Sequence, residues 1–228
     1  MTSFNLMILA AGYGKRMENL TQNIPKPLLK INNTTLLSNT INFFYNLGCN
    51  QFVINTHYLH NQINNYININ HSNKNITISF EPEILNTGGG IKKAINYFNN
   101  KNIVITNSDI FWDQNNRKDV INFINKFHNI KNCSLLLSKK ENAIGINKNN
   151  GDFIIKDNYL KRWKKNYPIF FYSGLQIVNS EIFKNFPDTK FSINKIWDNL
   201  IENNKLEGNI MDSKLMHIGD KKTYSTYI

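Results

Sequence analysis

The sequence predicts an α/β fold, built on a doubly wound, predominantly parallel but mixed sheet with helices on both faces. Short apolar runs typical of buried strands alternate with segments whose apolar residues repeat at helical spacing. These strands and helices follow one another at short intervals, as in doubly wound sheets. Glycine-rich or acidic segments follow two of the strands, and such sheets bind ligands beyond the strand ends. Together these observations predict a Rossmann-like architecture with one ligand crevice.

The first half of the chain carries this alternation most clearly. Residues 6–9 form an apolar run long enough for a buried strand. Residues 35–47 place apolar side chains along one helical face, and Gly48 follows as a C-terminal cap. Further strands are predicted at 52–54, 76–80 and 103–106, and further helices at 59–69 and 91–98.

The pattern changes in the second half. Strands are predicted at 133–137, 169–178, 206–211 and 215–218, and helices at 120–127, 193–201 and 221–227. Residues 143–146 and 153–155 are expected to form one hairpin around the turn-rich tract Asn149-Asn150-Gly151. Asp220 is expected to cap the last helix. Because no linker or repeat separates the halves, one domain is predicted over 1–228.

Composition limits the classes of function. The chain has 228 residues, contains no apolar run of membrane-spanning length and lacks the pattern of a secretory signal. Its net charge is +11, but the lysines are scattered, whereas a nucleic-acid footprint is clustered. Cys49 and Cys133 lack metal-ligand spacing and are expected to be reduced core residues. We therefore expect a cytoplasmic protein that binds neither nucleic acid nor membrane, and we make no prediction of its oligomeric state.

The segment after the first strand is the main candidate site. Ala10-Ala11-Gly12-Tyr13-Gly14 has little side-chain bulk, so its backbone N–H groups can approach a ligand closely. Lys15 and Arg16 follow it, and Lys26 stands between two prolines that each fix their own φ. Neither the dinucleotide fingerprint nor the Walker A sequence is present. A strand, a small-residue loop, two adjacent cations and a clamped lysine indicate a polyphosphate site.

The same stretch resembles the signature of the sugar-phosphate nucleotidyltransferase superfamily. In order and at the expected spacing it contains Leu9-Ala10-Ala11-Gly12, Gly14-Lys15-Arg16, Thr21 and Pro25-Lys26-Pro27. Proteins of this superfamily join a nucleoside triphosphate to a sugar 1-phosphate and release pyrophosphate. The resemblance implies a nucleotide-binding half over 1–112 and a sugar-phosphate-binding half over 113–228.

The resemblance also implies residue roles. Arg16 would neutralise the leaving pyrophosphate, Lys26 would steady the acceptor phosphate and the α-phosphate, and Asp109 would hold Mg²⁺. The nucleotide is expected to contact Leu9, Ala10, Ala11, Gly12, Gly14, Lys15, Thr87 and Gly88.

A second glycine cluster refines the resemblance. Residues 87–91, Thr-Gly-Gly-Gly-Ile, most resemble the N-acetylmuramate 1-phosphate uridylyltransferases of peptidoglycan recycling. This likeness implies UTP and N-acetylmuramate 1-phosphate as substrates. The sugar phosphate is expected to contact Asn107, Gly151, Ser173 and Gly174. Guanylyl and cytidylyl transferases share the first motif, and relatives use mannose, heptose or choline phosphates, so these alternatives stay open.

One position departs from the family pattern. The family usually supplies a second metal-binding aspartate near the C-terminus, in an Asp-x-Gly arrangement, where this chain has His217-Ile218-Gly219. Imidazole suits transition metals better than Mg²⁺, which prefers oxygen ligands. Asp109 and the nucleotide phosphates could hold the ion alone, His217 could bind it through water, or the metal site could be impaired. The third alternative predicts a nucleotide-binding homologue without catalysis.

Overall fold

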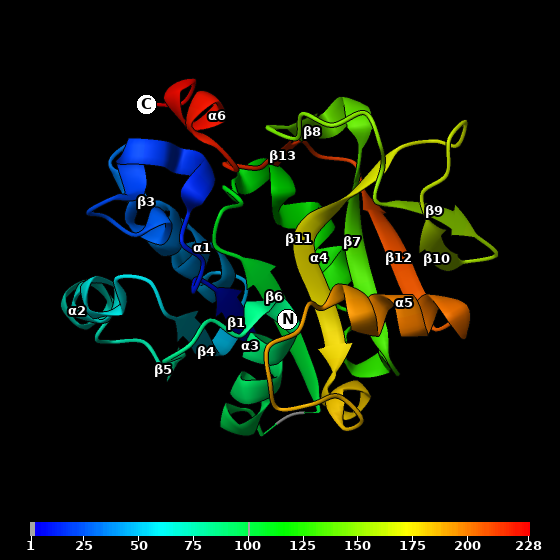
Figure 1. The fold of residues 1–228 in the computed structure, drawn as a ribbon, viewed down its shortest axis with the longest axis horizontal. Helices are drawn as coiled ribbons and strands as arrows, with labels where there is room; N and C mark the ends of the chain where they lie inside the picture. The colour runs from blue at the N-terminus through cyan, green and yellow to red at the C-terminus, as the bar shows by residue number, and fades with distance from the viewer. Residues whose placement is uncertain (1–2, 100) are drawn as a thin grey trace.

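A nine-stranded sheet forms the centre of the computed structural model, which describes residues 3–99 and 101–228 (Figure 1). The strand order is β5-β4-β1-β6-β11-β7-β12-β10-β9. These strands are β1 Phe4–Leu9, β4 Cys49–Thr56, β5 Ile76–Phe80, β6 Asn102–Asn107, β7 Cys133–Lys139, β9 Phe153–Lys156, β10 Tyr159–Arg162, β11 Phe170–Asn179 and β12 Leu206–Met211. Two small sheets pair β2 Lys30–Ile31 with β3 Thr34–Thr35 and β8 Ala143–Ile144 with β13 Leu215–Met216.

The first part of the sheet is parallel, and its register sets the position of the cleft. β1 pairs in parallel with both β4 and β6, and β4 pairs in parallel with β5. Leu9, the last residue of β1, lies opposite Asn55 on one side and Asn107 on the other. The three carboxyl ends are therefore level, so the segments that follow them meet at one edge of the sheet.

The second part of the sheet is mixed. β11 runs antiparallel to both β6 and β7, whereas β12 runs parallel to β7. The pairing of β11 with β7 is interrupted between Tyr172 and Gln176, and Gly174 inside this bulge has φ +87°. The predicted mixed α/β sheet is confirmed, with its parallel strands concentrated around β1.

Helices cover both faces of the sheet, as predicted. The helices are α1 Leu36–Tyr45, α2 His60–Asn70, α3 Asn86–Ala94, α4 Arg117–Ile124, α5 Asn194–Glu202 and α6 Lys221–Ser225. Leu6 and Ile8 of β1 pack into the core that contains α1, α2 and α4, whereas Met7 packs with α3 and α5. This period-two alternation is that of a strand buried on both faces. In Figure 1, α5 crosses in front of β11, β7 and β12.

The predicted hairpin between residues 143–146 and 153–155 is wrong. β8 instead pairs in parallel with β13, and β9 forms a hairpin with β10. Asp157 and Asn158, between β9 and β10, both have positive φ, as a tight two-residue turn requires. Asp and Asn tolerate this conformation, so the turn lies here and not at the Asn149-Asn150-Gly151 tract.

The start of α3, the cap of α6 and the state of the two cysteines can each be compared with the predictions. α3 begins at Asn86 rather than at Ile91, so the three glycines form its first turns. Asp220 caps α6 by accepting a hydrogen bond from the Thr223 N–H at 2.8 Å, as predicted. Cys49 and Cys133 are free and buried, and burial raises the pKa of both thiols.

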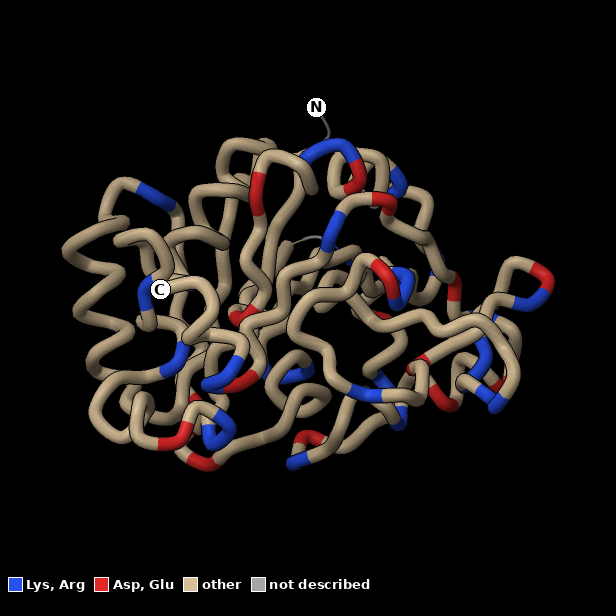
Figure 2. The backbone as a smooth tube through the Cα atoms, turned by 90° about the horizontal axis from the view of Figure 1, so that it is seen from above, with Lys and Arg blue, Asp and Glu red and all other residues tan. Residues whose placement is uncertain are grey.

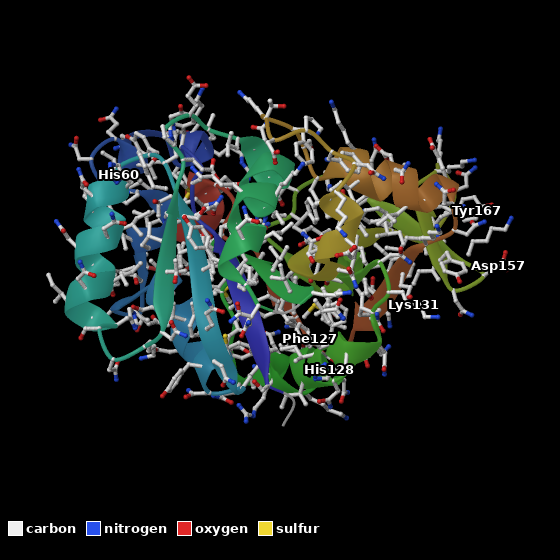
Figure 3. The ribbon with its side chains drawn as sticks, turned by 90° about the horizontal axis from the view of Figure 1, so that it is seen from below. His60, Phe127, His128, Lys131, Asp157 and Tyr167 are labelled. Carbon is white, nitrogen blue, oxygen red and sulfur yellow. The ribbon has the colours of Figure 1, made fainter. Side chains whose placement is uncertain are left out.

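Among the described residues, charged positions are distributed along the whole chain and are not gathered in one region (Figure 2). Lys and Arg positions are spread along the whole tube, with acidic residues among them (Figure 2). His60 on α2 lies near one end of the molecule, and Asp157 in the β9–β10 turn lies at the other (Figure 3). Across residues 3–99 and 101–228, every helix is too short or too polar to cross a membrane.

Candidate active site

A cleft of about 610 Å³ lies beyond the carboxyl ends of β1, β4 and β6. The structure brings most of the predicted site residues to this cleft, from segments far apart in the sequence. Those that line it are Leu9, Ala10, Ala11, Gly12, Gly14, Lys15, Arg16, Lys26, Thr87, Asn107 and Asp109.

The loop after β1 is held at both of its ends. The Ala10 N–H donates to the Asn55 Oδ1 at 2.8 Å, which ties the beginning of the loop to β4. Gly14 ends the loop with φ +67°, and a Cβ there would lie 3.1 Å from the Lys26 Cβ. Only glycine adopts this conformation readily, so Gly14 lets the loop turn while it packs against Lys26. The loop therefore has a fixed shape, with Gly12 exposed on the cleft.

Lys26 and Asp109 form one ion pair on the floor of the cleft. The Lys26 Nζ donates to the Asp109 Oδ2 at 2.6 Å, and the side chains are 11% and 18% exposed. Pro25 and Pro27 flank Lys26 in a short turn in which the Leu28 N–H donates to the Pro25 carbonyl. The fixed φ of each proline keeps the lysine side chain on the cleft side of this turn.

His217 is the second neighbour of Asp109. The Ile218 N–H donates to the Asp109 carbonyl at 2.8 Å, which sets the two segments side by side. The His217 Nε2 lies 3.4 Å from the Asp109 Oδ2. Burial alone would raise the pKa of Asp109, but the charge of Lys26 and the hydrogen bond from His217 outweigh it and hold that pKa far below its usual range. Asp109 is therefore ionised wherever the protein is folded near neutral pH.

The fit of a metal ion depends on two orphaned atoms. The Asp109 Oδ1 and the His217 Nδ1 are buried and have no hydrogen-bond partner among the described residues. No group of three or more metal-ligating side chains occurs within residues 3–99 and 101–228. Mg²⁺ commonly takes one or two carboxylates and completes its shell with phosphate and water oxygens. The residues present therefore fit an ion that shares its ligands with a bound nucleotide.

Arg16 and Lys15 stand at the mouth of the cleft. Both side chains are exposed and line the cleft, and Arg16 lies close enough to Asp220 to act on it. The Thr223 N–H holds the pKa of Asp220 below its usual value, and the charges of Arg16 and His217 add to this effect. The exposed guanidinium is free to meet an anion that enters the cleft.

The second glycine segment contributes Thr87 but not the amide of Gly88. Thr87 lines the cleft at the start of α3. The Gly88 N–H instead donates to the Phe191 carbonyl at 3.0 Å, and a Cβ on Gly88 would lie 2.4 Å from the Phe191 ring. In this structure Gly88 brings α3 close to residues 191–193 and offers no free donor to a nucleotide.

Only one of the four residues predicted to contact the sugar phosphate lines the cleft. Asn107 lines the cleft, whereas Gly151, Ser173 and Gly174 do not. Ser173 is fully buried, and its hydroxyl accepts a hydrogen bond from the Leu175 N–H at 3.3 Å. Gly151 lies against the Trp163 ring.

Gly174 packs against the segment that contains Asp109. A Cβ on Gly174 would lie 2.7 Å from the Ile110 Cγ1 and 3.4 Å from the Asn107 Cβ. The absence of a side chain at Gly174, inside the bulge of β11, therefore leaves room for residues 107–110, and bulges are common beside active sites. Gly174 thus supports the position of Asp109 from behind.

Sequence reasoning missed several residues that line the cleft, among them Asn55, Glu81 and Ser192. Asn55 follows the apolar run of β4, and this strand-end position is the same signal that drew attention to Asp109. Glu81 is only 1% exposed and follows β5 directly. Ser192 reaches the cleft from the segment before α5 and has no local sequence signal.

The comparison with known families agrees with this geometry. The family described as nucleotidyl transferase matches residues 5–220, which is nearly the whole chain. The chain belongs to the nucleotidyl transferase family. The family membership predicted from the first motif is confirmed. This nucleotidyl transferase is an enzyme of the kind that transfers nucleotidyl groups to sugar phosphates.

Two full-length relatives differ in the reaction for which they are named. The N-acetylmuramate alpha-1-phosphate uridylyltransferase of Caulobacter vibrioides is 28% identical over 222 residues, which cover 94% of this chain and 91% of the relative. The D-glycero-alpha-D-manno-heptose 1-phosphate guanylyltransferase of Campylobacter jejuni is 26% identical over 225 residues, with 97% of each chain covered. Both relatives match nearly the whole chain, and they differ in the base and the sugar phosphate for which they are named.

Solved structures share the fold. HddC from Yersinia pseudotuberculosis, in complex with GMP-PN, superposes with a TM-score of 0.80 at 20% identity and covers 98% of this chain and 97% of its own. The inositol-1-phosphate CTP transferase of T. maritima gives a TM-score of 0.80 at 12% identity, over 98% of this chain and 92% of its own. These similarities confirm the α/β sheet architecture of this nucleotidyl transferase.

Proposed function

We propose that this nucleotidyl transferase joins UTP to N-acetylmuramate 1-phosphate and releases pyrophosphate. The observation that carries the proposal is the single cleft in which the loop after β1, Arg16, Lys26 and Asp109 meet. The 28% identical relative that spans 94% of the chain supports the choice of base and sugar. The proposal rests on the sequence motif and on the chemistry of the cleft.

The reaction is an in-line displacement at the α-phosphorus. An oxygen of the sugar phosphate forms the new P–O bond, and the bond to the bridging oxygen of the β-phosphate breaks. The electron pair leaves with pyrophosphate, so the protein has little covalent work and contributes positioning and charge. The backbone of Gly12 and Gly14 would hold the triphosphate, Lys26 would steady the two phosphates that react, and Arg16 would neutralise the leaving group.

The proposed metal is Mg²⁺, held by Asp109 with oxygens of the nucleotide. Its chemistry is to balance phosphate charge and to fix the phosphate geometry. Lys26 now occupies the Oδ2 of Asp109, and the free Oδ1 is the atom available to the ion. Asn107, the last residue of β6, lies opposite Leu9 in the sheet and lines the same cleft, where it would contact the sugar phosphate.

Two alternatives each have an observation in their favour. A guanylyltransferase for a heptose 1-phosphate is supported by the relative that is 26% identical over 97% of both chains. A nucleotide-binding homologue without catalysis is supported by His217, which stands where the family usually has a carboxylate.

A matrix of nucleotides and sugar phosphates tests all three readings. The purified protein is mixed with UTP, GTP, CTP or ATP and with N-acetylmuramate, heptose or mannose 1-phosphate, with Mg²⁺ or Mn²⁺, and pyrophosphate is measured. The proposal predicts the fastest release with UTP and N-acetylmuramate 1-phosphate, and the Asp109→Asn variant is the inactive control. Faster release with GTP and the heptose phosphate favours the guanylyltransferase. Nucleotide binding without pyrophosphate in any mixture favours the inactive homologue.

A further inference from the structure

Both ends of the loop after β1 are linked to Glu81 through hydrogen-bonded side chains, one end through Asn55 and the other through His57. At the first end, the Ala10 N–H donates to the Asn55 Oδ1 at 2.8 Å. The Asn55 Nδ2 in turn donates to the Glu81 Oε1 at 2.8 Å. Asn55 and Glu81 are 4% and 1% exposed, so water competes little for these bonds.

The other end of the loop is linked to Glu81 through the side chains of Tyr13 and His57. The Tyr13 hydroxyl lies 3.0 Å from the His57 Nε2, and the His57 Nδ1 lies 2.8 Å from the Glu81 carbonyl oxygen. A carbonyl oxygen can only accept, so the Nδ1 carries the proton of neutral His57 and the Nε2 accepts from Tyr13. The rings of Tyr13 and His57 meet edge to face at 5.4 Å.

Glu81 also positions the second segment of the cleft. Its Oε2 accepts a hydrogen bond from the Leu85 N–H at 2.9 Å, directly before α3 begins. Asn86 and Thr87, the next two residues, line the cleft. The carboxylate and the carbonyl of Glu81 thus link the loop after β1 to the start of α3, and both segments line the cleft that would receive a nucleotide.

Tyr13 further orders a cation of the cleft. The Lys15 Nζ lies 5.5 Å from the centre of the Tyr13 ring, within the range of a cation–π contact. The Tyr58 ring also packs against the Tyr13 ring, with the two ring centres 5.6 Å apart. Tyr13 itself is 40% exposed, so its hydroxyl could face water, yet it is bound to His57.

We propose that Tyr13 and His57 are positioning residues that hold the loop after β1 and Lys15 in the shape that receives the triphosphate. The inference rests on the proposed function, in which this loop binds the triphosphate. An ordered loop spares the nucleotide the entropy of arranging its own binding site, and this gain appears as affinity. Neither residue touches the reacting atoms; both act through the backbone of residues 12–14 and through Lys15.

A double-mutant cycle measures this role directly. Tyr13→Phe removes only the hydroxyl, and His57→Asn keeps a donor for the Glu81 carbonyl while it loses the partner of Tyr13. Binding of magnesium UTP, GTP, CTP and ATP is measured by titration calorimetry without sugar phosphate. Each single variant is expected to weaken binding of the preferred triphosphate about fivefold, the effect of one net hydrogen bond. The double variant is expected to bind no more weakly than the weaker single variant, because both changes break the same bond.

Tyr66→Phe is the matched control. The Tyr66 hydroxyl also bonds to a side chain, the Ser38 Oγ at 2.8 Å, but it lies between α1 and α2, away from the cleft residues. This variant is expected to lower the melting temperature and to leave triphosphate affinity unchanged.

The outcomes separate this inference from the proposed function. Triphosphate binding by the wild-type protein that is unchanged in Tyr13→Phe overturns the positioning role alone, even if the melting temperature falls. Losses that add in the double variant show two independent effects and overturn the shared bond. Failure of the wild-type protein to bind any of the four triphosphates overturns both the inference and the proposed function.

Discussion

The Lys26 ammonium lies 2.6 Å from the Asp109 Oδ2, so a lysine clamped by two prolines and an aspartate beyond β6 share one hydrogen bond. Neither side chain is more than 18% exposed, and solvent ions screen such a pair weakly. Each charge therefore satisfies the other while the cleft holds no ligand. An entering phosphate competes for Lys26, and an entering cation competes for Asp109, so the two halves of the proposed chemistry are coupled.

Lys26→Met should leave the charge of Asp109 without its main partner. Removing one member of a buried ion pair costs about 3 kcal/mol in the free energy of unfolding. Turnover should fall by at least about a hundredfold, the scale of one transition-state donor. Urea unfolding and pyrophosphate release measure the two effects. Adding Asp109→Asn should recover stability but not turnover, and Lys184→Met, in an exposed pair with Glu181, should change neither.

Gly174→Ala should disturb Asp109 from behind. Its φ of +87° strains any side chain, and a Cβ would lie 2.7 Å from the Ile110 Cγ1. We expect a loss of about 1–3 kcal/mol in stability together with lower turnover. Asn158→Ala strains a residue of similar φ in the distant β9–β10 turn, so it should lower stability and spare turnover. Equal turnover in the two variants would contradict the supporting role of Gly174.

His71 should make stability depend on pH. Its Nε2 lies 2.7 Å from the Ser38 Oγ, and burial, with a smaller contribution from the charge of Lys74, lowers its pKa below 6.5. The unfolded chain therefore binds this proton more readily than the folded protein does. The stability that neutral His71 contributes is complete above about pH 6.5 and is lost as the pH falls through the lower folded pKa.

Urea unfolding measured between about pH 5 and 7.5 tests this expectation. The pH dependence of the free energy of unfolding should correspond to about one titrating group. His71→Gln should flatten the pH dependence of the free energy of unfolding. His128→Gln, a change at an exposed histidine, should follow the wild-type curve (Figure 3). A wild-type slope that survives in His71→Gln would assign it to other groups.

The metal preference should report on His217. Chelation with EDTA should stop pyrophosphate release and added Mg²⁺ should restore it; if the His217 imidazole also contacts the ion, Mn²⁺ should restore release better than Mg²⁺, because imidazole suits the transition metal. His217→Asp should shift the ratio of Mg²⁺ to Mn²⁺ affinity about tenfold toward Mg²⁺, as changes near a metal site commonly do. An identical ratio in both proteins, measured by metal titration with UTP present, would show that His217 takes no part.

Local sequence was sufficient for the elements whose signal is local. The apolar run of β1, the small-residue loop and the two prolines around Lys26 are adjacent in the chain, so their arrangement followed from the sequence. The cap of α6 was equally local, because Asp220 contacts Thr223 three residues later. The predicted hairpin between 143–146 and 153–155 was wrong because the sequence offers two turn-rich tracts, 149–151 and 157–158. Only the pairing of β8 with β13 and of β9 with β10 shows which tract forms the hairpin turn.

Contacts between distant segments lay beyond sequence reasoning. Glu81 gains its place in the cleft from Asn55 and Leu85, and its carbonyl meets His57. Ser173 was expected to contact the sugar phosphate, but in the structure it lies in the β11 bulge with its side chain fully buried. The roles of the cleft residues and the division into halves at 112 stay predictions.

Arg16→Ala tests the central claim most directly, namely that the loop after β1 and its flanking cations serve a triphosphate. Arg16 is exposed, so its removal should leave the melting temperature unchanged. Arg117→Ala, at an arginine on α4 outside the cleft, is the matched control. The account predicts that Arg16→Ala releases pyrophosphate about a hundredfold more slowly than both the wild type and Arg117→Ala. Release at the wild-type rate would contradict it.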